Sequence, residues 1–147
     1  MKKQTKKYKQ TVIPQAFTAE WKNMPVKEFH EKVSTYYRTH YQGKCRVINQ
    51  HLGIAVEFDR EGVNKTSYGG HLYAKKACLV EVLDKMIRYA EYSNWGNRKP
   101  TDKLTVIGYL NFKVKVKIDG KLEHVYLVIR VTNNGKFHYS MEVNIWK

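Results

Sequence analysis

The chain has 147 residues, a length that favours one domain with its own hydrophobic core and argues against two domains of ordinary size. Its 27 lysines and arginines outnumber its 13 aspartates and glutamates, and the net charge of +14 predicts a polyanionic partner, above all nucleic acid. No stretch is apolar enough for a membrane span or a signal peptide, so we expect a cytoplasmic protein that does not bind membranes.

The first residues of the chain are basic and show no periodic pattern. We expect residues 1–17 to form a flexible arm and residues 18–147 to form a single domain. The arm is either a tail that grips phosphate or an ordinary solvated terminus. Its lysines are Lys2, Lys3, Lys6, Lys7 and Lys9.

One helix and two short strands are predicted next. Pro25 suits the first turn of a helix that runs to about Tyr41, and apolar residues follow at helical spacing. Gly43 marks the end of that helix. Residues 45–48 and 53–58 are rich in β-branched residues and predict two strands joined by a polar turn.

A loop and a second helix come after these strands. Residues 59–70 are polar, contain three glycines and lack a period, which indicates a loop. Residues 73–92 place apolar side chains on one helical face and predict the second helix. Residues 94–102, with Gly96 and Pro100, are expected to connect this helix to the last part of the chain.

The last third of the chain predicts a three-stranded antiparallel meander. Asp119-Gly120 favours a type I′ turn, and Asn133-Asn134-Gly135 favours a three-residue loop that ends in a left-handed glycine. The first turn sets Ile118 opposite Lys121, Lys115 opposite His124, and Lys113 opposite Tyr126. The second sets Val131 opposite Phe137, Arg130 opposite His138, Leu127 opposite Met141, Val128 opposite Ser140, and Tyr126 opposite Glu142. A slip of one residue would expose the apolar set, which argues for this register.

These elements predict an α+β domain. We expect a curved antiparallel sheet of about five strands, ending in the three-stranded meander, with two helices packed on its apolar face. The polar face is then left open. It collects the candidate nucleic-acid-binding residues Lys113, Lys115, Lys117, Tyr126 and Ser140, together with His124, Arg130, His138 and Glu142.

Several of these residue types suit RNA cleavage without a metal. Such cleavage needs a base for the 2′ hydroxyl, an acid for the leaving oxygen, and a cation for the charged phosphorane. Glu142 or His124 is the candidate base and His138 the candidate acid. Arg130 or Lys115 is the candidate phosphate clamp. The alternative is an ordinary solvated strand face with favourable charged pairs.

A second candidate site lies at the start of the second helix. His71 follows two glycines there, and Lys75 and Lys76 are close to the same helix end, where an anion could bind. The alternative is a surface histidine at a helix entry. No metal-binding motif is present, and Cys45 and Cys78 have neither zinc nor disulfide spacing, so we expect no metal or other cofactor.

Several local signatures resemble a domain of the large polyvalent proteins of phages and mobile elements. They are residues 43–49 leading to 53–58, the helix at 75–90, Asp119-Gly120-Lys121 before residues 125–128, and residues 135–139. That domain is similar in turn to the nucleases that join barnase, EndoU, tRNA-cutting colicins and RelE toxins. The resemblance covers about residues 18–144. It implies a phage or mobile-element origin and a curved sheet that binds RNA on the face away from its helices.

The sequence therefore leaves three functions open. The first is a metal-independent ribonuclease, and the second is a domain of the same fold that binds RNA or DNA without cutting it. The third is a module that binds a host or phage protein, with the positive face docked on an acidic partner. RNA is the favoured ligand, and the sequence does not define an oligomeric state.

Overall fold

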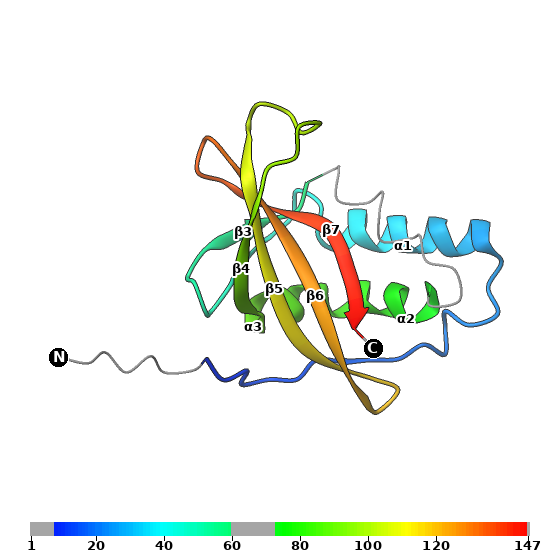
Figure 1. Cartoon of the computed structure of the whole chain (residues 1–147). Coiled ribbons are helices and arrows are strands. Elements are labelled where there is room, and N and C mark those ends of the chain that lie inside the picture. Colours follow the sequence, from blue (N-terminus) through cyan, green and yellow to red (C-terminus); the bar gives the residue numbers. More distant parts are fainter. Residues whose placement is uncertain (1–7, 60–72, 147) are drawn as a thin grey trace.

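The computed structural model describes residues 8–59 and 73–146, with only the backbone at positions 26, 73, 140–144 and 146 (Figure 1). The predicted α+β class is confirmed. In chain order the elements are β1 (Gln15–Ala16), α1 (Val26–His40), β2 (Arg46–Ile48), β3 (Ala55–Glu57), α2 (Tyr73–Cys78), the 3₁₀ turn η3 (Leu79–Val82), α3 (Leu83–Tyr89), β4 (Glu91–Asn97), β5 (Val106–Ile118), β6 (Lys121–Thr132) and β7 (Phe137–Trp146).

All the described strands belong to one sheet. Its order is β1-β5-β6-β7-β3-β2, and β4 pairs with β5 next to β1. The C-terminal meander β5-β6-β7 is antiparallel as predicted, and β4-β5 and β2-β3 are antiparallel too. Two contacts, β1-β5 and β3-β7, are parallel, so the sheet is mixed and has seven strands where about five were expected.

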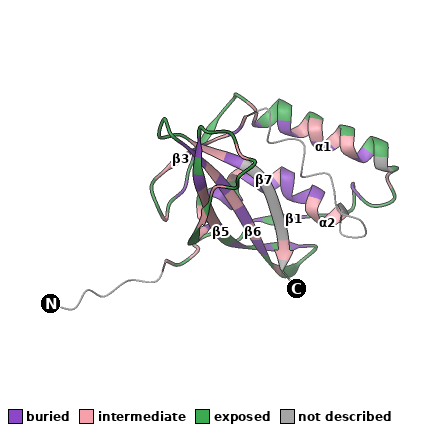
Figure 2. Ribbon diagram, turned by 45° about the horizontal axis from the view of Figure 1, so that its top comes forward, coloured by how far each residue is buried: buried purple, intermediate pink, exposed green. Residues whose placement is uncertain are grey.

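The helices cover one face of this sheet (Figure 2), and buried residues alternate with more exposed ones along its central strands. In β5 the even positions Phe112, Val114 and Val116 are buried against the helices, while Lys113 and Lys115 between them are exposed. The apolar stripe of α1 and that of η3 and α3 complete the core. Burying each large apolar side chain contributes roughly 1.5–3 kcal/mol, which fixes the faces of the sheet and leaves the lysines in solvent.

The second predicted helix is wrong in its last part. It breaks at Val82, where φ is −120° and ψ is 19°, and it ends at Ala90, whose backbone is extended. Glu91 to Asn97 form β4, although the sequence suggested a helix end and a connection there. The cause is long-range pairing. Residues 91–97 form antiparallel strand pairs with Gly108 to Lys113 of β5, and this pairing outweighs their local preference for a helix.

The predicted register of the first hairpin is confirmed throughout. Asp119 and Gly120 have φ values of 52° and 81°, as a type I′ turn requires, and Ile118 pairs with Lys121. Lys115 therefore lies opposite His124, and Lys113 lies opposite Tyr126.

The second hairpin keeps its predicted register only near its turn. Gly135 is left-handed as expected, and Arg130 lies opposite His138. After Ile129 the register changes by two residues, so that Leu127 pairs with Val143 instead of Met141 and Tyr126 pairs with Asn144 instead of Glu142. A bulge in β7 across from Val128 takes up the extra residues, so the predicted pairing of Val128 with Ser140 is also wrong.

Candidate nucleic-acid interface

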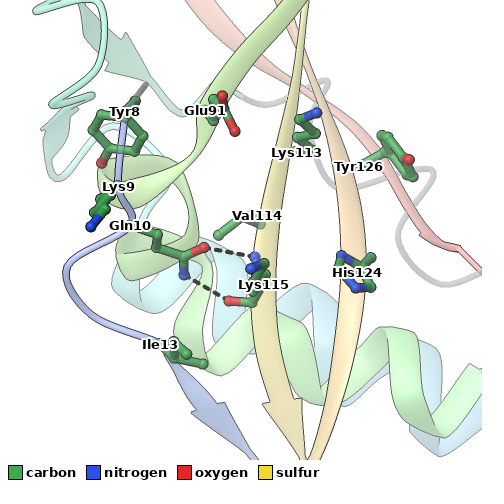
Figure 3. A pocket seen from close by; sticks show the side chains of 10 residues that line it. All are labelled: Tyr8, Lys9, Gln10, Ile13, Glu91, Lys113, Val114, Lys115, His124 and Tyr126. Atoms are coloured by element: carbon green, nitrogen blue, oxygen red, sulfur yellow. Dashed lines mark hydrogen bonds between the residues drawn. The ribbon is translucent and has the colours of Figure 1, made fainter. Parts of the chain in front are cut away.

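A pocket of about 410 Å³ opens where β5 and β6 meet the first described residues of the chain (Figure 3). We call it the lysine pocket. Its walls come from the N-terminal segment, the start of β4, and the middle of β5 and β6. They consist of Tyr8, Lys9, Gln10, Ile13, Glu91, Lys113, Val114, Lys115, His124 and Tyr126. Four of the residues predicted from the sequence, Lys113, Lys115, His124 and Tyr126, thus gather at one site.

Strand pairing holds these four side chains together. Lys113 is the cross-strand neighbour of Tyr126, and Lys115 is that of His124. Residues directly opposite each other have Cβ atoms about 4.5–5.5 Å apart, so each pair shares one patch of surface. Lys113, Lys115 and His124 are exposed. Within the described part of the chain, none of these three takes part in an ion pair.

The N-terminal wall of the pocket is attached to the backbone of β5. The amide of Gln10 accepts a hydrogen bond from the Lys115 N–H at 2.9 Å and donates one to the Lys115 carbonyl at 2.8 Å. Four residues further on, the Pro14 carbonyl accepts from the Lys117 N–H at 2.9 Å. The described end of the predicted arm therefore follows the sheet edge, while the boundary between arm and domain stays a prediction.

The N-terminal segment is also hydrogen-bonded to the β5–β6 hairpin turn. The Asp119 carboxylate accepts hydrogen bonds from the backbone N–H and the hydroxyl of Thr18. These bonds favour the ionised carboxylate and hold the pKa of Asp119 below its usual range. The segment that walls the pocket is thus fixed to the meander at Gln10, Pro14 and Thr18.

Sequence reasoning missed this wall. Tyr8, Gln10 and Ile13 were assigned to a basic arm, and Glu91 to a helix end. The run Thr11-Val12-Ile13 before Pro14 was the available signal, because β-branched residues next to a proline are typical of an extended segment at a sheet edge.

A second group of charged side chains lies further along the same face, and we call it the Asp59 cluster. One Asp59 oxygen, Oδ2, is 2.7 Å from Arg130 Nη2 and 3.2 Å from His138 Nδ1. The other ring nitrogen of His138 is 3.5 Å from the Thr132 hydroxyl. The side chains of Arg130 and His138 are 17% and 14% exposed, so both are largely covered. Sequence reasoning had placed Asp59 in a polar loop and had not connected it with either residue.

The predicted catalytic residues are divided between these two groups. His124 and Arg130 are about 20 Å apart, because both lie on β6 and a strand rises about 3.3 Å per residue. The lysine pocket therefore holds His124 and Lys115, and the Asp59 cluster holds His138 and Arg130. Of Ser140 and Glu142 the structure describes only the backbone in β7, and His71 lies outside the described residues.

The remaining candidate lysines are not in the pocket. Lys117 is exposed on β5, on the same face as Lys113 and Lys115. Lys75 lies on α2 and is 3.8 Å from Glu123, whose strand position opposite the buried Val116 puts it on the helix side of the sheet. Lys76 is also on α2 and partly buried. The two α2 lysines thus belong to the other side of the sheet.

Two further observations concern cofactors and membranes. In residues 8–59 and 73–146, no three histidine, cysteine or acidic side chains are grouped as metal ligands would be. No helix in the same residues has the length and apolar content that a membrane crossing requires.

Among known protein families, the one described as large polyvalent protein-associated domain 3 has a model that matches residues 25–139 of this chain. The match supports the resemblance to domains of large polyvalent proteins and the phage or mobile-element context that it implies. No curated protein and no solved structure matches the chain. The description of the family names neither a ligand nor a reaction, so the likeness to nucleases stays a prediction.

Proposed function

This chain belongs to the family of large polyvalent protein-associated domain 3, and within that family we propose a nucleic-acid-binding role for it, with RNA as the favoured ligand. One observation carries the proposal. Lys113, Lys115 and His124 are exposed around a single pocket, and no ion pair within the described residues occupies them. Exposed lysines that are held by a sheet and are not engaged in ion pairs are suited to phosphate groups.

Two further features support a nucleic acid over another anion. Tyr8 and Tyr126 also line the lysine pocket. In sites of this kind the aromatic rings stack on bases and the lysines bind phosphates. The net charge of +14 extends the attraction beyond the pocket and speeds encounter with a polyanion.

The test is a binding titration with labelled RNA and labelled single-stranded DNA in EDTA, between 50 and 200 mM salt, followed by fluorescence anisotropy. Lys113→Ala with Lys115→Ala is expected to weaken RNA binding by about 10- to 100-fold at low salt. The dependence of log K on log salt should also become shallower by about 1.4–1.8, because two phosphate contacts are lost.

The matched control is Lys27→Ala with Lys44→Ala. Lys27 is exposed on α1 and Lys44 is exposed beside β2, at the sheet edge opposite the pocket, and the change in charge is the same. Equal loss in both double variants would mean that only net charge matters and would overturn the role of the pocket. If the unaltered protein binds neither nucleic acid at 50 mM salt, the proposal is wrong and an acidic protein partner replaces it.

The Asp59 cluster favours a second candidate function, metal-independent RNA cleavage. Asp59 Oδ2 lies 3.2 Å from Nδ1 of His138, and Arg130 is adjacent, so the cluster brings together a carboxylate, an imidazole and a guanidinium, the groups that such cleavage requires. We rank this function second because the same carboxylate also neutralises Arg130, which would otherwise clamp phosphate. Cleavage of labelled RNA in EDTA that disappears in His138→Ala with Arg130→Ala would reverse this ranking.

A further inference from the structure

We propose that the lysine pocket holds one unpaired nucleotide of the bound strand, with its phosphate against Lys113 and Lys115 and its base beside Tyr126, and that Glu91 favours bases with an exocyclic amino group. This inference rests on the proposed function and makes it more specific. It concerns which nucleic acid is bound and which base is preferred.

The shape of the pocket favours an unpaired strand over a duplex. A row of lysines on an open sheet would serve a duplex as well as a single strand. Here the N-terminal segment closes one side, and the pocket volume of about 410 Å³ lies in the range of sites that enclose small ligands. Figure 3 shows Lys113 and Lys115 on β5 between Tyr8 and Gln10 on one side and His124 and Tyr126 on the other. A base must leave its stack to enter such a site, which unpaired strands permit at little cost.

The position of the lysines carries the second step. Lys113 and Lys115 project from the same face of β5, about 7 Å apart at their backbones, because side chains alternate along a strand. Tyr126 is the cross-strand neighbour of Lys113. A phosphate held by the lysines therefore brings its own base toward the tyrosine ring, where stacking adds affinity without regard to sequence.

Tyr8 is the second aromatic side chain at the pocket. Its ring packs against that of His51, with the centroids 4.7 Å apart, so the side chain is held in place at the wall. Together with Tyr126 it gives the pocket two aromatic rings, which suits an unpaired base.

Glu91 gives the preference between bases. It is the only carboxylate among the described residues that line the pocket, and β4 places it opposite Lys113. No ion pair links the two side chains within the described structure. A carboxylate beside a phosphate site lowers affinity for any anion, unless it accepts hydrogen bonds from the ligand. Exocyclic amino groups of bases are such donors, and cytosine N4 is one of them.

The experiment compares four labelled ligands of equal length at 50 mM salt: oligo(C), oligo(U), oligo(A) and a blunt RNA duplex. The full chain is expected to bind oligo(C) and oligo(A) about tenfold more tightly than oligo(U), and more tightly than the duplex. Glu91→Gln should reduce the ratio of oligo(C) to oligo(U) affinity by about fivefold without weakening oligo(U) binding. Glu31→Gln, an exposed position on α1, is the matched control and should leave the ratio unchanged.

A pair of tyrosine variants tests the stacking. Tyr126→Leu should lose the preference for single strands, Tyr126→Phe should keep it, and thermal melting of both should show folded protein.

If all four ligands bind equally and Lys113→Ala with Lys115→Ala weakens all of them, the protein binds nucleic acid but the inference is wrong. If Glu91→Gln leaves the oligo(C) to oligo(U) ratio unchanged, the role of Glu91 is wrong. If no ligand binds, the proposed function itself fails.

Discussion

The lysine pocket and the Asp59 cluster lie on the same face of the sheet and share strand β6, yet their basic side chains differ in burial and in ion pairing. In the pocket, Lys113 and Lys115 are exposed and have no ion-pair partner among the described residues. In the cluster, Arg130 and His138 are largely covered and both face the carboxylate of Asp59. Within the described residues, Asp59, two positions after β3, is the acidic side chain that makes this difference.

The sequence alone does not show which basic side chains form ion pairs within the protein and which remain exposed to solvent. The cluster joins the segment after β3 to β6 and β7 through the contacts of Asp59 Oδ2 with Arg130 and His138. Lys113 and Lys115 in the pocket take part in no ion pair within the described residues, so they are open to an anion from outside. Four variants test this division, in order of decreasing expected effect.

Asp59→Asn should have the largest effect, and it should be on stability. The change keeps the shape of the side chain but removes the carboxylate charge that faces Arg130 and His138, so the free energy of unfolding should fall by about 1–3 kcal/mol. This range is below that of a fully buried pair because the three side chains keep some contact with water.

Chemical denaturation measures that loss, with Glu31→Gln as the control that changes an exposed carboxylate to an amide. RNA affinity of Asp59→Asn should stay within about twofold of the unaltered protein. A tenfold loss of binding with unchanged stability would instead assign the cluster to the ligand.

Variants of His138 and His124 should have effects of intermediate size, the first on stability and the second on RNA affinity. His138→Gln removes a side chain that contacts both Asp59 and Thr132, and it should lower the free energy of unfolding by about 1 kcal/mol while RNA affinity hardly changes. His124→Gln, at an exposed pocket position, should change stability by less than about 0.5 kcal/mol and weaken RNA binding by about twofold. Melting curves and anisotropy titrations on both variants check this, and the reverse pattern would refute the division.

Gln10→Ala should have the smallest effect. It removes both side-chain hydrogen bonds to the Lys115 backbone, which lies near solvent, so the cost should be about 0.5 kcal/mol. Hydrogen exchange of the Lys115 amide should become faster, while that of the Lys117 amide should not, because the latter is bonded to the Pro14 carbonyl. Gln15→Ala, an exposed glutamine in β1, is the matched control. Unchanged exchange at Lys115 would mean that the N-terminal wall does not persist in solution.

The parts of the fold that local chemistry determines could be predicted from the sequence. Asp119-Gly120 defined a turn, the turn defined the register of β5 and β6, and the register placed Lys113 beside Tyr126 and Lys115 beside His124. The first helix followed in the same way from Pro25 and its apolar period.

The parts that depend on distant pairing could not be predicted in this way. Residues 91 and 92 end a helical pattern and residues 94–97 suggest a connection, yet residues 91–97 form a strand because they pair with β5. The bulge opposite Val128 has no local signal, so Glu142 was placed opposite the wrong residue. Gln10 and Lys115 are 105 residues apart in the chain, and Asp59 and Arg130 are 71 apart, so neither contact leaves a trace in sequence spacing.

The side chain of Gln10 also has a consequence for how this protein behaves at high concentration. The backbone of β5 that faces away from β6 is paired with β4 at Lys113 and with the Pro14 carbonyl at Lys117. Between these points the Gln10 amide, with one donor and one acceptor, takes the place of a peptide group of a neighbouring strand at Lys115. An unpaired stretch of β backbone is a template on which another molecule can add a strand and begin to aggregate. Gln10 closes that short gap, so a chain that begins after residue 10 would leave the backbone of Lys115 open to a strand from another copy.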